Sequence, residues 1–281
     1  MDPPVAQRLT GGRLHLSHGP IDVVLRAWGA PEPVRAAEEA AIALFPSILP
    51  GLVAELVELR RPMSDRPRVA HPVARRMVAA CAPFAAVFVT PMAAVAGAVA
   101  DALLAAMWAA APLDRAYVND GGDIALRVRA GESLAVGLAA DPARLALDAA
   151  LRVAAESGIG GIATSGRHGR SFSLGIADAV TVLARDAATA DVAATLIANA
   201  VDLDSPAVRR APAVSLDPDS DLGGRLVTVG LGPLTDGQVA AALAAGLVRA
   251  EAYRAEGLIL GAALRLGSDV RATGLAALPA P

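Results

Sequence analysis

The sequence predicts an α+β fold in which short, mostly antiparallel strands pack with long alanine-rich helices. Short apolar segments alternate with polar residues and come in groups separated by turn residues, which is typical of antiparallel strands. The long alanine-rich segments lie between these groups rather than after every strand, so a regular βαβ array is not expected. We expect a single domain over residues 1–281, with a division into two lobes near 110–140 as the alternative.

In the first half, apolar residues alternate on both sides of His18-Gly19-Pro20, which predicts a hairpin. Further elements are expected as helices over 31–45, 52–60 and 72–80, a charged loop over 60–71, a buried strand over 84–89 and a small-residue helix over 92–110. Pro50-Gly51 is expected to separate the first two helices.

In the second half, Asn119-Asp120-Gly121-Gly122 is the strongest turn signal of the chain. The expected elements are strands over 116–118, 124–128 and 134–138, an amphipathic helix over 142–156, strands over 159–163 and 179–184, a helix over 187–200, an irregular segment over 202–224, a strand over 226–229, a helix over 235–254 and a closing strand over 258–266.

Composition excludes several classes of function. All 25 basic residues are arginine, so the chain cannot supply a P-loop lysine or a Schiff-base lysine. A net charge of -3 and an aromatic content of 3% give no reason to expect a nucleic-acid partner. The single cysteine, Cys81, cannot form an internal disulfide and fits a reducing compartment.

The apolar stretch over 84–111 is long enough to span a bilayer. Pro91 divides it, however, and Asp101 lies in its second half, so we expect a buried core helix. The first 20 residues lack the apolar region of a signal peptide. We therefore expect a soluble, cytoplasmic protein without a membrane partner.

Asp191 and Thr195 are four residues apart on a predicted helix, so they share one face. A carboxylate and a hydroxyl offer two oxygen ligands to Mg²⁺, which completes its shell with waters and phosphates. The alternative is that Asp191 complements the helix dipole and Thr195 bonds the preceding turn. Spacing alone leaves both readings open.

The segment 160–170 contains glycines, hydroxyls and two arginines after a strand, which suits a bound phosphate or another anion. A glycine-rich loop with solvated arginines is the alternative. His168 in this loop is a candidate general base or a polar surface residue. The turn at Asn119 either approaches a ligand closely or only joins two strands.

The order of these segments resembles the ApbE family of magnesium-dependent flavin transferases. The resemblance covers about residues 84–200, and its most specific pieces are Ala-Asp-x-x-x-Thr at 190–195 and Ala-Thr-Ser-Gly at 163–166. His18-Gly19-Pro20-Ile21-Asp22 and Thr90-Pro91-Met92 resemble an uncharacterised branch of the same superfamily. Members of the main family use FAD to attach FMN to a threonine or serine of a target protein.

The resemblance implies site residues position by position. Metal ligands would be Asp191, Thr195 and the carbonyl of Ala93. Cofactor contacts would come from Thr90, from Asn119, Gly121 and Gly122 of the turn, and from Thr164, Ser165, Gly166 and Arg167 of the loop. The implied cofactors are Mg²⁺ and FAD or another flavin or nucleotide.

This sequence also departs from the family. A lysine that helps to bind FAD is replaced by Ala96, and an upstream aspartate is replaced by Thr90. The hairpin that carries a histidine in the family is reduced to residues 173–178. His168 and Asp178 are the catalytic candidates that remain.

Three functions follow as expectations. The first is an ApbE-like protein that binds a flavin or nucleotide pyrophosphate with Mg²⁺. The second is an active FMN transferase acting on a partner protein, and the third is a non-catalytic scaffold or homo-oligomer.

Overall fold

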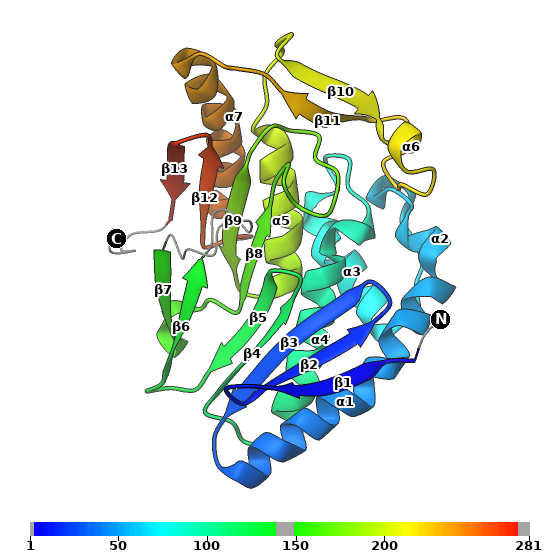
Figure 1. Ribbon diagram of the computed structural model, residues 1–281, viewed down its shortest axis with the longest axis vertical. Helices are drawn as coiled ribbons and strands as arrows, with labels where there is room; N and C mark the ends of the chain where they lie inside the picture. The colour runs from blue at the N-terminus through cyan, green and yellow to red at the C-terminus, as the bar shows by residue number, and fades with distance from the viewer. Residues whose placement is uncertain (1–2, 139–148, 275–281) are drawn as a thin grey trace. The chain divides into compact units, whose positions relative to one another are not determined.

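The computed structural model of the chain describes residues 3–138 and 149–274. In this part of the chain there are seven α-helices, thirteen strands and four short 3₁₀ helices (Figure 1). Packing divides the chain into two compact units, and each is composed of several segments. Unit 1 contains residues 1–136, 151–163 and 184–191, and unit 2 contains the remainder.

The first unit has a sheet whose strands follow the order β1-β2-β3-β4-β5-β8. Every neighbouring pair is antiparallel. The strands are β1 (Val5–Leu9), β2 (Arg13–His18), β3 (Ile21–Trp28), β4 (Arg115–Asp120), β5 (Asp123–Val128) and β8 (Gly161–Ser165), of which β8 continues into unit 2. The predicted hairpin at His18 is confirmed, because β2 and β3 pair from Leu14↔Leu25 to His18↔Ile21.

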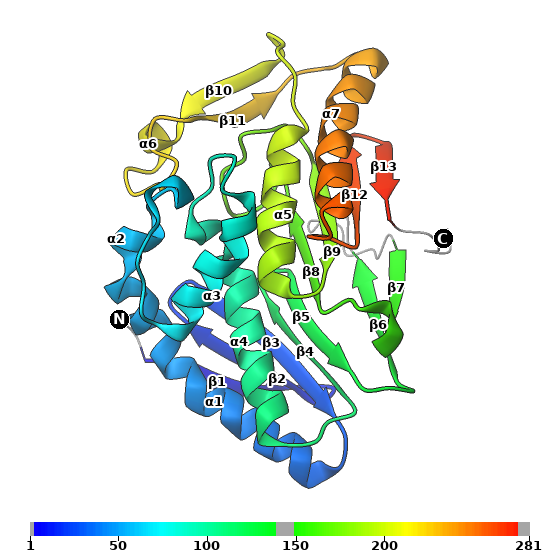
Figure 2. The same cartoon turned by 180° about the vertical axis from the view of Figure 1, so that it is seen from behind.

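The helices of unit 1 are α1 (Pro31–Ala54), α2 (Leu56–Leu59), η1 (Met63–Asp65), α3 (Pro72–Cys81), η2 (Ala82–Phe84), η3 (Pro91–Ala94) and α4 (Val95–Ala110), with η4 (Ala155–Ser157) preceding β8. Of these, α1 and α4 pack on one face of the sheet, and α3 packs on α4 (Figure 2). The core lies between sheet and helices, where Val23, Leu25, Ile48 and Leu103 are fully buried. Alternation in β3 and the apolar stripe of α1 produce this core.

Helix α1 is one continuous helix, so the break predicted at Pro50-Gly51 is wrong. Interior prolines cost a helix about 3 kcal/mol each. That cost is offset because Phe45, Ile48 and Leu52 of the same helix are buried. The ring of His71 also packs where a Cβ on Gly51 would lie, 2.3 Å from its Cδ2. The glycine therefore admits a packed side chain instead of ending the helix.

The strand predicted over 84–89 is also wrong, because the segment after η2 has no regular structure. Its burial does not alternate: Phe84 and Val89 are buried, while Ala85 and Ala86 are exposed. One backbone hydrogen bond, from Met63 N–H to the Val89 carbonyl, anchors its end. An apolar run can thus be buried without joining a sheet.

The boundary between the units runs through β6 (Ser133–Leu138), β7 (Ala149–Ala154), β9 (Ala179–Ala184) and α5 (Ala187–Ala200) as well as through β8. The helix predicted over 142–156 is wrong where it can be compared, because 149–154 forms β7, which pairs with β6. Buried Leu151 and Val153 flank exposed Arg152, and this two-residue period is that of a strand. Residues 142–148 lie outside the described part.

Unit 2 contains the rest of the elements. They are β10 (Val208–Pro212), α6 (Ala213–Leu216), β11 (Leu226–Leu231), α7 (Asp236–Ala255), β12 (Gly261–Leu266) and β13 (Asp269–Thr273). Strand β12 pairs with both β9 and β13, and α7 packs on β12 and β13. The irregular segment predicted over 202–224 is partly wrong, because β10 and α6 lie within it and β10 pairs with β11.

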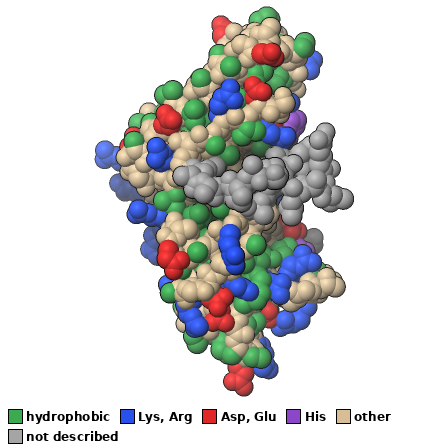
Figure 3. All heavy atoms as spheres, turned by 90° about the vertical axis from the view of Figure 1, so that its left-hand side faces the viewer, with side chains coloured by type: hydrophobic (Ala, Val, Ile, Leu, Met, Phe, Trp, Pro, Cys, Tyr) green, Lys and Arg blue, Asp and Glu red, His purple; other side chains and the backbone are tan. Residues whose placement is uncertain are grey.

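Two helical segments, α1 and Pro91–Ala110, are long and apolar enough to cross a membrane. Of their most apolar windows, 39% and 50% respectively are buried inside the structure. Helices in a protein core have the same composition, so the absence of a membrane partner stays a prediction. On the described surface in Figure 3, acidic and basic side chains are interspersed with apolar ones.

Candidate functional site

Asp191 lies near the start of α5, beside the first turn of α4, within unit 1. Its Oδ2 accepts a 3.1 Å hydrogen bond from the backbone N–H of Gly97. The two helices can approach this closely because a Cβ on Gly97 would lie 2.3 Å from the carbonyl oxygen of Ala187. Close backbone packing therefore holds the carboxylate in place.

The electrostatic environment of Asp191 is unfavourable for a negative charge. Burial of the carboxylate is the largest cause that raises its pKa well above the usual value, and the charges of Asp123 and Asp120 raise it further. Backbone N–H groups of Gly97 and Ala96 act in the opposite direction. Three carboxylates thus influence one another here, and a divalent cation would relieve their repulsion.

The turn between β4 and β5 brings Asp120 and Asp123 to this region. Asn119 Oδ1 accepts a 2.8 Å hydrogen bond from the backbone N–H of Gly122 and thereby closes the turn. Gly121 and Gly122 have φ values of +64° and +118°, which favour glycine. In this structure the side-chain oxygen of Asn119 has a structural partner, and its contact with a cofactor stays a prediction.

Thr90 and Ala93 lie at the entrance to α4. Thr90 is buried, and its carbonyl accepts hydrogen bonds from Ala93 N–H at 3.1 Å and from the Cys81 thiol at 3.4 Å. Ala93 belongs to η3, and Ala96 lies in the first turn of α4. The interpretation of Cys81 as a core residue is confirmed by its 0% exposure, and burial raises the pKa of its thiol.

Within unit 2, hydroxyl groups gather where β8 ends. Thr195 Oγ1 on α5 donates to Ser165 Oγ at 3.5 Å. Thr164 Oγ1 and Thr181 Oγ1 are 2.9 Å apart. Gly166, which follows Ser165, has a φ of +159°, and a Cβ added to it would lie 2.4 Å from the carbonyl oxygen of Asp178. The glycine thus lets the loop pass over the Asp178 backbone.

The carboxylate of Asp178 organises this loop. Its Oδ1 accepts from Arg167 Nε at 2.8 Å, forms an ion pair with Arg167 Nη2 at 2.7 Å, and lies 3.2 Å from His168 Nε2. Its Oδ2 accepts from the backbone N–H of Gly267 at 2.6 Å. The structure therefore brings the two catalytic candidates, His168 and Asp178, together. It also engages the Arg167 guanidinium, which was predicted to bind an anion.

Among the described residues, no group of three histidine, cysteine, aspartate or glutamate side chains has the geometry of a metal cluster. Magnesium does not require such a group, because it commonly takes one or two carboxylates and completes its shell with waters and phosphates. The predicted donors, which are a carboxylate, a hydroxyl and a carbonyl, are all hard oxygens. Their chemistry fits Mg²⁺.

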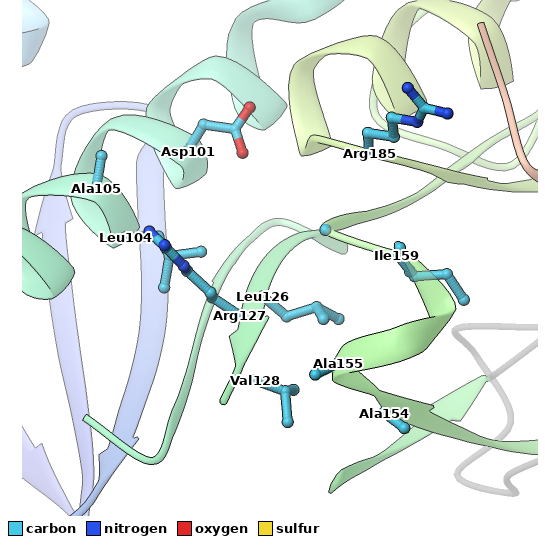
Figure 4. Close-up of a pocket in the computed structure, with 12 residues that line it drawn as sticks. Asp101, Leu104, Ala105, Leu126, Arg127, Val128, Ala154, Ala155, Ile159 and Arg185 are labelled. Carbon is cyan, nitrogen blue, oxygen red and sulfur yellow. The ribbon is translucent and has the colours of Figure 1, made fainter. Parts of the chain in front are cut away.

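Sequence reasoning missed a cavity of about 370 Å³ in unit 1 (Figure 4). Its lining includes Asp101, Arg127 and Arg185 and none of the predicted site residues. The only signal in the sequence was Asp101, a carboxylate in an apolar helix. Its oxygens accept N–H groups of Ala187 at 3.1 Å and Ala188 at 3.0 Å, and burial raises its pKa to about 6.

Comparison with curated proteins finds relatives without an assigned activity. A UPF0280 protein of Methanothrix thermoacetophila is 42% identical over 137 residues, which are 48% of this chain and 55% of that protein. A UPF0280 protein of Methanopyrus kandleri is 41% identical over 152 residues, which are 53% of this chain and 58% of that protein. The matched region thus spans little more than half the length of these relatives.

Among solved structures, a similar one is the apo form of the flavinyl transferase ApbE of Pseudomonas stutzeri. It is 14% identical, with a TM-score of 0.44, over 97% of this chain and 96% of the other. The family described as AbpE bacteria matches residues 6–272, which are most of the chain. The chain therefore belongs to this ApbE-like family, as its sequence motifs predicted.

Proposed function

We propose that this protein binds a flavin or another nucleotide pyrophosphate together with Mg²⁺. The observation that carries the proposal is the position of Asp191, whose carboxylate is held at the first turn of α4 by the N–H of Gly97 and lies near enough to Asp123 and Asp120 to be affected by their charges. Carboxylates that repel one another favour a bound divalent cation. Family membership supports the same function.

Asp191 and the carbonyl of Ala93 would hold the metal ion, for which the family resemblance also implies Thr195 as a ligand, and the ion would neutralise the charge of the pyrophosphate. Ser165 lies within hydrogen-bond reach of Thr195 and would donate its hydroxyl to a phosphate oxygen. Thr164 and the loop backbone at Gly166 would add further contacts. Asn119, Gly121 and Gly122 would border the metal corner from the β4–β5 turn.

Isothermal titration of the full chain with FAD, FMN and ADP, with and without Mg²⁺, tests this proposal. We expect saturable binding that requires Mg²⁺ and that is lost in Asp191→Asn and weakened in Thr195→Val. The control is Asp204→Asn, which removes an exposed carboxylate outside the candidate site. Binding that is absent, or that is the same in Asp191→Asn and the control, would contradict the proposal and favour a non-catalytic scaffold.

One observation favours a second function, FMN transfer to a partner protein. His168 Nε2 lies 3.2 Å from Asp178 Oδ1, and a carboxylate can orient a histidine as a general base for an attacking hydroxyl. Incubation with FAD, Mg²⁺ and a threonine-bearing target domain, followed by mass spectrometry, should then show an FMN adduct of the target together with released AMP. An intact, unmodified target with a chain that binds FAD would contradict transfer while leaving binding in place.

A further inference from the structure

The cavity in unit 1 has both apolar and polar walls (Figure 4). Its apolar lining includes Leu104 of α4, Leu126 and Val128 of β5, and Ile159 before β8. Arg127 and Arg185 lie on different sides of it, and Asp101 reaches it from α4. A volume of about 370 Å³ lies within the range of small-molecule sites.

Arg127 is positioned by an aromatic ring rather than by a carboxylate. Its guanidinium carbon lies 4.7 Å from the centroid of the Trp108 ring, within the range of about 6 Å that is usual for a cation–π interaction. Within the described part of the chain it makes no ion pair, whereas Arg129, two residues later, pairs with Asp114 at 3.0 Å. Stacking covers the face of the guanidinium and leaves its N–H edge for a planar or tetrahedral oxyanion.

The other charged groups that line the cavity also favour a bound oxyanion. Arg185 is exposed, and it too makes no ion pair among the described residues. Asp101 is the single carboxylate in the lining, and each of its oxygens accepts a backbone N–H group of α5. Two guanidinium groups therefore outnumber one carboxylate whose hydrogen bonds are already made.

We propose that this cavity binds a small amphipathic oxyanion. Its phosphate or carboxylate head contacts the guanidinium of Arg127, and its short apolar body packs against Leu126 and Ile159. Phosphate and carboxylate share the geometry that a guanidinium recognises. The site is independent of the metal corner, because no proposed flavin or metal ligand lines it.

Isothermal titration of the full chain, without Mg²⁺ or nucleotide, tests the proposal with hexyl phosphate, hexanoate, inorganic phosphate and hexanol. Hexyl phosphate and hexanoate compare the two head groups on a similar apolar chain. Inorganic phosphate tests the head group alone, and hexanol tests the apolar chain without a charged head. A Trp28→Phe background leaves Trp108 as the only indole of the chain, so its fluorescence reports ligand at Arg127 directly.

Two variants alter the cavity in different ways. Arg127→Gln removes the charge, and Ala105→Phe fills space from an exposed position of α4 that lines the cavity. The control, Arg75→Gln, removes an exposed arginine of α3 that does not line it. Circular dichroism of each variant confirms that it is folded before titration.

We expect saturable one-to-one binding of hexyl phosphate or hexanoate that is tighter than that of either fragment. Arg127→Gln should weaken it at least about tenfold, because a charge-assisted contact is lost. Ala105→Phe should weaken it by a similar factor, and the control should not change it. Absence of binding at millimolar concentration, or equal binding in Arg127→Gln and the control, would overturn the proposal.

Discussion

The backbone N–H of Gly97 on α4 donates a 3.1 Å hydrogen bond to the carboxylate of Asp191 on α5. The contact depends on the missing side chain, because a Cβ at Gly97 would lie 2.3 Å from the carbonyl oxygen of Ala187. One glycine thus sets the distance between two helices and orients the carboxylate that we propose as a metal ligand.

Gly97→Ala should lower the free energy of unfolding by about 2 kcal/mol or more. The new Cβ would meet the carbonyl group of Ala187 and the Cα of Ala188, which belong to the backbone and cannot rotate away. The matched control is Gly237→Ala in α7, where a Cβ would meet nothing within 4 Å. There we expect no loss, or a gain of about 0.5–1 kcal/mol from the better helix propensity of alanine. Urea unfolding measures both, and equal effects would show that the helix contact is unimportant.

Local patterns predicted the elements whose burial is itself periodic. The hairpin around His18 and the helix over 187–200 are examples, because alternation and alanine content reflect how those residues are buried. Residues 84–89 and 149–154 were misassigned for the opposite reason. A short apolar or alanine-rich run fits several structures, and pairing with a distant strand decides among them.

The candidate site shows the same limit. Motif resemblance found Asp191, Thr195 and the loop at Thr164, but it could not show what their neighbours do. The contact of Asp178 with Gly267 joins residues 89 positions apart, and the approach of Asp101 to Ala187 joins residues 86 positions apart. Such contacts arise from tertiary packing, which the spacing of residues along one sequence does not encode.

Asp178 is predicted to be a stabilising residue of the loop in addition to a catalytic candidate. Asp178→Asn should lower the free energy of unfolding by about 2 kcal/mol, because Arg167 loses its charged partner at a side chain that is 8% exposed. His168→Gln is the comparison: its imidazole is 53% exposed, so we expect a change within about 0.5 kcal/mol. Thermal and urea unfolding test this. No loss of stability in Asp178→Asn would contradict the structural role.

Glu55 is expected to hold the loop that precedes α3. Its carboxylate accepts the N–H groups of Ala70 at 2.6 Å and of His71 at 3.1 Å. Glu55→Ala should release this loop and cost about 1–3 kcal/mol, because two backbone donors lose their acceptor.

Limited trypsin digestion offers a direct measurement, since the chain has no lysine and Arg68 lies in this loop. Cleavage after Arg68 should accelerate in Glu55→Ala and stay unchanged in the control Glu39→Ala, which alters an exposed glutamate of α1. Equal cleavage rates in the two variants would contradict the anchoring role.

The ionisation of Asp101 should lower the free energy of unfolding as the pH rises from about 4 to about 7. Burial raises its pKa in the folded state to about 6, from an ordinary value of 3.8. As the pH rises, the unfolded chain therefore releases this proton first, and the folded state is disfavoured until its own carboxyl group ionises. The stabilising contribution is complete below pH 3.8 and is lost as the pH passes through about 6.

The measurement is the difference in unfolding free energy between the wild-type protein and Asp101→Asn at several pH values. Every other titrating group is common to both proteins, so the difference isolates Asp101. A pKa shift of two units corresponds to roughly 3 kcal/mol, so the advantage of the wild type over the variant should shrink by up to that amount from pH 4 to pH 7. A difference that is constant, or that grows with pH, would mean that the N–H groups of Ala187 and Ala188 outweigh the cost of burying the charge.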